Sequence, residues 1–397
     1  MQLGWIDFSK EDRNKVFNVL NLLSEEGVLD ELGIAPIRDA FSNIFFPGIT
    51  TIQTRAKYFL IVPYAFQDLE LSKNHTNLKN KLGKIEKNSA IIMKNNNDST
   101  ESGIIGSSVI PSGWVQRPPS SIYLAGLRTY GIFKNDSNGN RISIDKYLHM
   151  ISKAIQEKDN YSNAGNQSSD EEDYHDDKNA GDNLSLGILN IETYDSNWCN
   201  DNLTIDLTEE EGNFLKRQIS ESCPDSLIAF ILENPIELPE QMSFYGLDSS
   251  VFPHHLKKFY DMAIEFSNFN YALVVIYNLI ATQGENEDVL KEFEKLDFDE
   301  LSKIDIENIM EELEVNNYML KTFLNKCKQY MKENRIRFLK DIIIEREKKL
   351  KTESRSRLSN LSEVDTSKWY AGGKLDYRFG VAKDIINDIF KSETGVE

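Results

Sequence analysis

The stretch FPHHLKKFYDMAIEFSNFNYALVVIYNLIATQ, residues 252–283, decides the fold class. Its first half repeats apolar residues at helical spacing, and its second half is apolar on nearly every side, as expected at the centre of a helical domain. The longest apolar run, residues 271–280, is too short to span a bilayer and contains Asn278. The stretch therefore predicts an amphipathic helix and then a buried central helix, in a mainly α-helical protein without a membrane segment.

Further helices are predicted on both sides of this stretch. Thr208 and Glu211 form a capping box that starts one helix, and SLIAFIL at residues 226–232 predicts a short buried one. Apolar residues with a 3.6-residue rhythm predict a single long helix over residues 316–351 and a last amphipathic helix over residues 382–390.

The beginning of the chain predicts three short helices. A capping box opens the first, over residues 9–27, and an apolar stripe marks the second, over residues 37–45. The third runs from Thr50 or Thr51 to Pro63, where the proline bends or ends it. Three short helices joined by tight turns predict a helix-turn-helix-like bundle.

Residues 156–183 are poor in aliphatic side chains and rich in Asn, Ser, Gly and Asp. Such a segment buries too little apolar surface to offset the entropy cost of ordering it, so we predict a disordered acidic linker or insertion. It separates an N-terminal helical domain with the helix-turn-helix-like bundle, residues 1–155, from a larger C-terminal helical domain, residues 184–397.

Composition restricts the class of protein and its compartment. The chain has 397 residues and a formal net charge of -19, which disfavours a protein that coats DNA with its whole surface. Three scattered cysteines without a CxxC pair argue against a disulfide framework and a zinc ribbon. The first residues, MQLGWIDFSKED, have neither the basic nor the apolar region of a signal peptide. These features predict a cytoplasmic protein.

Acidic and basic residues are concentrated in separate segments of the second half of the chain. Residues 284–314 carry 13 acidic and 3 basic residues, whereas residues 331–357 carry 10 basic and 5 acidic ones. We expect the two segments to pack as antiparallel helices whose faces partly neutralise each other. Net charges of -10 and +5 leave an excess of five negative charges. The candidate residues for binding a basic partner protein are therefore Glu311, Glu312 and Glu314, and the alternative is a solvated acidic face.

Basic residues on amphipathic helices of the first half are the candidate nucleic-acid contacts: Arg55, Lys57, Arg117 and Arg128. The segment RPPSSIYLAGLRTYGIF, residues 117–133, predicts a helix that Ser120 or Ser121 caps and whose N-terminus favours phosphate. Much of this helix is apolar. The alternative is a structural corner in which Arg55 and Arg128 pair with internal carboxylates such as Asp39.

Motifs of known enzyme classes are absent from the sequence. It contains neither the phosphate-binding GxxxxGK[ST] pattern nor GxSxG or HExxH. We therefore predict no catalytic residue, no cofactor and no metal site. The alternative is a nuclease or other hydrolase with a dispersed carboxylate site, since 64 acidic residues supply many carboxylate pairs.

Three segments resemble signature stretches of an uncharacterised bacterial protein family: TRAKYFLIVPY at residues 54–64, RPPSSIYLAGLRTYGI at residues 117–132 and LDYRFGVA at residues 375–382. The family is a domain of unknown function that covers nearly the whole chain. Its members resemble accessory proteins of mobile-element or antiphage defence loci, where helicases and phospholipase D-like proteins are typical neighbours. The resemblance implies a non-enzymatic accessory subunit that binds such a partner protein from the same operon, with DNA as a second ligand.

Overall fold

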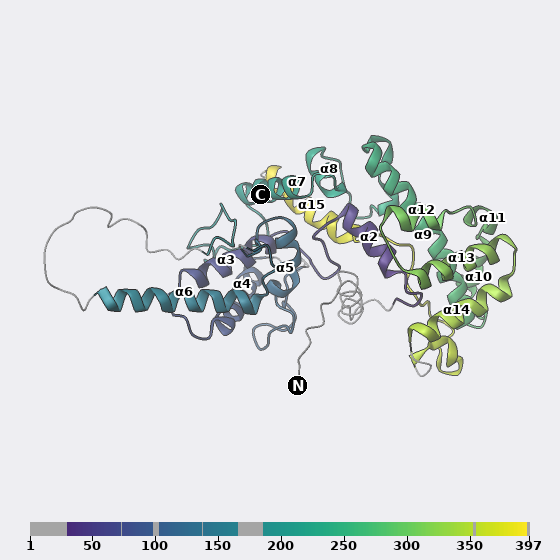
Figure 1. The fold of residues 1–397 in the computed structure, drawn as a ribbon, viewed down its shortest axis with the longest axis horizontal. Helices are drawn as coiled ribbons and strands as arrows, with labels where there is room; N and C mark the ends of the chain where they lie inside the picture. Colours follow the sequence, from purple (N-terminus) through teal and green to yellow (C-terminus); the bar gives the residue numbers. More distant parts are fainter. Residues whose placement is uncertain are drawn as a thin grey trace, which may run out of the picture. The chain divides into compact units, whose positions relative to one another are not determined.

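The structure, a computed structural model, describes residues 30–72, 74–97, 103–136, 138–165, 186–351 and 355–394. This part of the chain is mainly α-helical, as predicted, and its extended pairing is limited to one antiparallel bridge between Phe133 and Leu189 (Figure 1). The first predicted helix, residues 9–27, lies outside the described residues. The helix-turn-helix-like arrangement of three helices therefore stays a prediction.

The chain folds into two compact units, each built from two stretches of sequence. The first unit comprises Met1–Ala40 and Asp261–Leu375, and the second comprises Phe41–Tyr260 and Asp376–Glu397. These limits differ from those of the predicted domains, because ion pairs such as Lys57–Glu211 and Arg55–Asp388 join segments that the prediction placed in different domains.

The predicted linker, residues 156–183, falls only partly among the described residues. Helix α6 (Ile144–Gly165) includes residues 156–165, which are therefore helical rather than disordered. Residues 166–183 lie outside the described part, and for them the linker remains a prediction.

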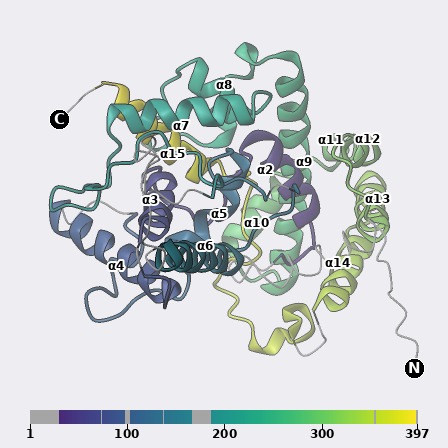
Figure 2. The same cartoon turned by 60° about the vertical axis from the view of Figure 1, so that its left-hand side comes forward.

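The first unit holds most of α9 and the helices that follow it. Their bounds are α9 His254–Ala281, α10 Glu287–Glu294, α11 Phe298–Leu301, α12 Ile306–Glu312, α13 Tyr318–Lys332 and α14 Ile336–Leu350, followed by the short 3-10 helices η4 Arg357–Ser359 and η5 Leu361–Glu363. Helices α11, α12 and α14 all pack against α13, as Figures 1 and 2 show. The stretch that decides the fold class forms one continuous helix, α9, and not the two successive helices that the sequence pattern predicted.

Asn278 has a structural role within the apolar run of α9. It is fully buried, and its amide nitrogen donates to the backbone oxygen of Tyr370 at 2.7 Å. Its amide oxygen accepts from the Tyr370 backbone nitrogen at 2.5 Å. Because an unpaired buried amide would be costly, these bonds both satisfy Asn278 and attach the chain at Tyr370 to the central helix.

The prediction of one long helix over residues 316–351 is wrong. Helix α13 ends at Lys332 and α14 begins at Ile336, and Asn334 between them has a positive φ of 52°. The Arg335 amide returns to the Tyr330 carbonyl at 2.8 Å, a bond that closes a helix C-terminus. Asparagine tolerates this left-handed backbone better than most residues, so Asn334 is the residue that divides the apolar pattern into a helical hairpin.

Short polar side chains start each of the small helices in the acidic segment and also α13, which follows it. Asn286 caps α10, Asp297 caps α11, Asp305 caps α12 and Asn317 caps α13, each accepting a hydrogen bond from a backbone amide in the first helical turn. Such a cap typically stabilises a helix by about 1 kcal/mol. Part of the acidity of residues 284–314 is therefore explained by helix capping.

The second unit contains the remaining helices. Their bounds are α3 Tyr58–Glu70, α4 Leu78–Asn96, α5 Pro119–Thr129, α6, α7 Glu209–Ser222, α8 Leu227–Glu233, η1 Phe244–Gly246, η2 Ser249–Val251 and α15 Phe379–Thr394; α2 (Ala35–Phe45) crosses the limit between the units. The predicted capping box at Thr208 and Glu211 is confirmed at the start of α7. Among the described helices of the chain, none is long and apolar enough to cross a membrane.

The sequence pattern predicted that Pro63 would bend or end its helix, and the helix does not end there. Pro63 lies inside α3, which begins only at Tyr58 and continues to Glu70. A proline in a helix interior removes one backbone hydrogen bond and normally costs about 3 kcal/mol. Nearly every side chain from Tyr58 to Phe66 is buried, so packing against α4 and α5 outweighs that cost.

Candidate functional site

Arg55 and Lys57 are not the exposed nucleic-acid contacts that the sequence pattern predicted. The Arg55 guanidinium contacts Asp388 at 2.9 Å and Asp206 at 3.3 Å. The Lys57 ammonium lies 2.5 Å from Glu211, and the two side chains are only 6% and 8% exposed. Both cations therefore hold elements of the second unit together, which corrects their assignment to a phosphate-binding surface.

Arg117 precedes α5 by two residues, and Arg128 lies in the last turn of that helix. Arg117 is exposed, whereas Arg128 is half-buried and donates to the backbone oxygen of Ile142. The Arg128 guanidinium also lies 5.8 Å from the centre of the Phe133 ring. Of the four predicted nucleic-acid contacts, Arg117 alone is exposed.

Helix α5 is a structural corner. Tyr123, Leu127 and Tyr130 are fully buried, and the Tyr123 hydroxyl accepts from the Thr54 amide at 2.8 Å. A β-carbon at Gly126 would lie 2.5 Å from the Gly48 carbonyl, so only glycine permits this close approach. The helix is thus part of the core of the second unit.

The N-terminus of α5 is capped by Glu86 of α4, and not by Ser120 or Ser121. The Glu86 carboxylate accepts from the Ser120 amide at 2.6 Å and is 1% exposed. A carboxylate thus occupies the position in which the sequence pattern placed a phosphate. Burial raises the pKa of Glu86 from 4.5 to about 7, although the hydrogen bonds from Ser120 oppose the shift.

The raised pKa of Glu86 predicts a pH-dependent stability. Between about pH 4.5 and pH 7 the folded protein keeps a proton on Glu86 that the unfolded chain has lost, so the free energy of unfolding falls as pH rises through this range. For a pKa that moves from 4.5 to about 7, the fall amounts to about 2–3 kcal/mol. Urea unfolding of wild type and Glu86→Gln at pH 5 and pH 8 measures it: the variant should lose that part of the pH dependence. The control is a Glu237→Gln variant, because Glu237 is exposed. Identical pH profiles of stability for wild type and Glu86→Gln would contradict the raised pKa of Glu86.

Glu311, Glu312 and Glu314 are all exposed, at the end of α12 and in the turn that leads to α13. Glu314 occupies the left-handed position after the helix, with a φ of 52°. Beyond the turn, the first two residues of α13 are Tyr318, 82% exposed, and Met319, 63% exposed. We name these five residues the α12–α13 corner. The sequence pattern missed Tyr318 and Met319, although both stand outside the apolar stripe that it identified in α13.

The ion pairs of the acidic segment differ from the predicted ones. Its three lysines contact acids of the same segment, Asp288, Glu292 and Glu300. Basic residues of the segment 331–357 have other contacts: Arg346 donates to the backbone oxygen of Leu32, and Lys351 and Arg357 contact Glu31. Helices α11 and α12 pack on α13, so the predicted antiparallel pairing of the acidic segment with the basic one is not the main packing.

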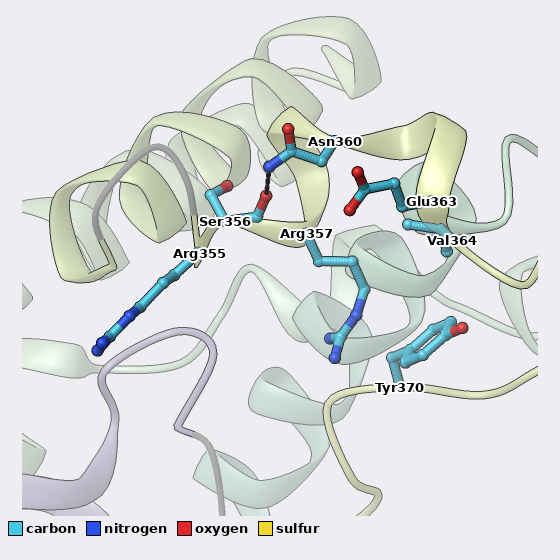
Figure 3. Close-up of a pocket in the computed structure, with 7 residues that line it drawn as sticks. All are labelled: Arg355, Ser356, Arg357, Asn360, Glu363, Val364 and Tyr370. Atoms are coloured by element: carbon cyan, nitrogen blue, oxygen red, sulfur yellow. Dashed lines mark hydrogen bonds between the residues drawn. The ribbon is translucent and has the colours of Figure 1, made fainter.

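The first unit also contains a pocket of about 340 Å³, lined by Arg355, Ser356, Arg357, Asn360, Glu363, Val364 and Tyr370. Figure 3 shows the Arg357 guanidinium beside the Tyr370 ring, while Arg355 extends in another direction. The Arg357 guanidinium lies 4.2 Å from the centre of that ring and donates to Glu31 at 3.0 Å and to the Tyr277 hydroxyl at 3.1 Å. Arg357 is therefore held in one orientation.

A buried carboxylate, Glu347, lies behind this pocket. It accepts hydrogen bonds from the Tyr277 hydroxyl at 2.7 Å, the Ser356 hydroxyl at 2.8 Å and the Leu358 amide at 2.9 Å. Burial, and then the bond to Glu347, raise the pKa of the Tyr277 hydroxyl, which therefore stays protonated and donates. Lys351 lies 3.3 Å from the same carboxylate.

The charges in and behind the pocket balance. Arg355, Arg357 and Lys351 are cationic, and the anionic side chains are Glu31, Glu347 and Glu363. The three cationic and three anionic side chains around the pocket therefore sum to zero. Its ordered side chains fix the chain segment at residues 355–370 against α9 and α14.

Residues 1–170 match a family of unknown function, DUF6361. The match includes two of the three segments in which the sequence resembles such a family, and not the third, at residues 375–382. It therefore covers less of the chain than the resemblance implied. No curated protein and no solved structure matches the chain. Over the ranges that the structure describes, no group of three or more His, Cys, Asp or Glu side chains is arranged to hold a metal ion.

Proposed function

We propose that the protein is a non-enzymatic accessory subunit of a bacterial antiphage defence system, which acts in the cytoplasm by binding a partner protein from the same operon. The partner we expect is a helicase or a phospholipase D-like protein, the kinds of neighbour that the family resemblance implies. The observation that supports binding is the exposed glutamate group of the α12–α13 corner, Glu311, Glu312 and Glu314, in a segment whose acids exceed its bases by ten.

An acidic surface of this kind suits a partner with a basic surface. Complementary charges accelerate the encounter of two proteins more than they strengthen the final complex. A protein that binds nucleic acid presents such a basic surface. The DNA part of the hypothesis now depends mainly on Arg117, because Lys57 is buried and both Lys57 and Arg55 are held in ion pairs.

Charge reversal tests the proposal. With the purified operon partner at about 50 mM salt, the triple variant Glu311→Lys, Glu312→Lys and Glu314→Lys should associate roughly 10-fold more slowly than wild type. The difference should shrink at about 1 M salt, where charges are screened within a few ångströms. Stopped-flow or biosensor association rates supply the measurement.

A matched control reverses three exposed acids elsewhere: Glu233, Glu237 and Glu240. This control changes the net charge by the same amount, so it separates a local surface from the overall charge of the protein. Equal association rates for wild type and the α12–α13 variant would show that the acidic face is only solvated.

A further inference from the structure

The outward face of α13 begins with two large apolar side chains that its packing does not require. The buried stripe of this helix consists of Leu320, Phe323, Leu324, Cys327 and Met331, at helical spacing. Tyr318 and Met319 precede the stripe and stand outside it, with exposed fractions of 82% and 63%. Polar residues are expected at such positions. Fold stability therefore does not explain why this pair is apolar.

The pair is held in place by the start of the helix. The Asn317 side chain accepts from the Leu320 amide at 3.0 Å, which fixes the first turn, and Leu320 itself is fully buried. On the preceding helix, Glu307 contacts Lys321 at 3.4 Å and so ties α12 to α13. Tyr318 and Met319 therefore lie in a rigid first turn of α13. Both are exposed there, beside the glutamates of the α12–α13 corner.

This combination matches the composition of binding surfaces. Tyrosine and methionine are enriched in the buried centre of protein interfaces, where tyrosine is a frequent anchor. Methionine adapts its shape to varied apolar partners. Charged residues at the rim set the encounter rate and exclude partners of like charge.

We infer that the α12–α13 corner binds a basic, amphipathic segment of the partner protein, whose apolar side chains cover Tyr318 and Met319 while its lysines or arginines face Glu311, Glu312 and Glu314. This inference rests on the proposed partner binding and adds the chemistry of the bound segment. Charge complementarity selects a basic segment, and the exposed apolar pair requires that the segment also present an apolar side.

Synthetic peptides test the inference without the natural partner. The probes are an amphipathic 18-residue peptide of lysine and leucine and a peptide of the same length and charge in which serine replaces leucine. Fluorescence anisotropy at about 50 mM salt measures their binding to the full chain. We expect the lysine and leucine peptide to bind at least 10-fold more tightly than the lysine and serine peptide.

Substitutions in the protein separate the contribution of the apolar pair to peptide binding from that of the three glutamates. The double variant Tyr318→Ala and Met319→Ala should weaken binding of the lysine and leucine peptide about 10-fold or more and leave the other peptide unaffected. Reversing the three glutamates should weaken both. Phe338→Ala is the control, because Phe338 is 50% exposed and lies on α14, outside the α12–α13 corner, with the Arg335 guanidinium 5.7 Å from the centre of its ring. Circular dichroism confirms that each variant is folded.

The outcomes separate the two proposals. Equal binding of the two peptides, binding of neither, or no effect of the Tyr318 and Met319 substitutions overturns the inference. The proposed function is judged separately, by the effect of reversing the three glutamates on association with the purified operon partner. If the glutamates were needed for association with the partner and the apolar pair were not, the proposed function would therefore stand and the inference would fall.

Discussion

A Lys57→Met variant is expected to lose about 3–5 kcal/mol of folding stability, because it leaves the buried Glu211 carboxylate without its cation. Glu211 is 8% exposed and lies 2.5 Å from the Lys57 ammonium. The same carboxylate accepts from the Thr208 amide at 2.8 Å and completes the capping box of α7. Loss of the lysine therefore affects both the junction of α3 with α7 and the start of α7. Urea unfolding followed by circular dichroism measures the change.

The double variant Lys57→Met and Glu211→Gln should recover most of this loss. It removes both buried charges, and glutamine retains an oxygen that accepts from the Thr208 amide. A double-mutant cycle then gives the coupling between the two side chains. If Lys57 instead contacted nucleic acid, Lys57→Met would weaken DNA binding and cost less than about 1 kcal/mol of stability, as surface substitutions do. That result would contradict the structural role.

Local signals in the sequence predicted many helices correctly. The capping box at Thr208, the short helix α8 and the C-terminal helix α15 depend on residues within a few positions of each other. The wrong predictions concern helix ends that depend on contacts with distant residues or on the backbone conformation of a single residue. Pro63 remains inside α3 because the helix is buried on nearly all sides, and Asn334 ends α13 by adopting a left-handed backbone.

The candidate site was harder to predict, because sequence shows charge but not burial. Arg55 and Lys57 find their carboxylates on segments far along the chain, at Asp388 and Glu211. One signal favoured burial: Lys57 directly precedes the apolar run YFLIVPYAF. The exposed glutamates of the α12–α13 corner were identified by charge alone, while Tyr318 and Met319 become conspicuous only when the stripe of α13 is known to be buried.

Glu347→Ala should destabilise the first unit by about 3–5 kcal/mol. The substitution leaves three buried donors without an acceptor: the Tyr277 hydroxyl, the Ser356 hydroxyl and the Leu358 amide. Each unsatisfied buried donor costs about 1–3 kcal/mol, and the sum is reduced where the chain relaxes toward water. Tyr277→Phe removes one of these bonds together with its donor, so we expect a loss of only about 1 kcal/mol.

Hydrogen exchange locates the effect within the chain. In wild type the Leu358 amide is buried and bonded to Glu347 at 2.9 Å, so it should exchange slowly. Glu347→Ala should expose this amide while amides at the centre of α9 keep their protection. The control is Glu345→Ala, an exposed position two residues earlier on the same helix, where we expect a change within about 0.5 kcal/mol. If the two alanine variants had similar stabilities and similar exchange at Leu358, Glu347 would not be the residue that anchors the segment at 355–370 to α14.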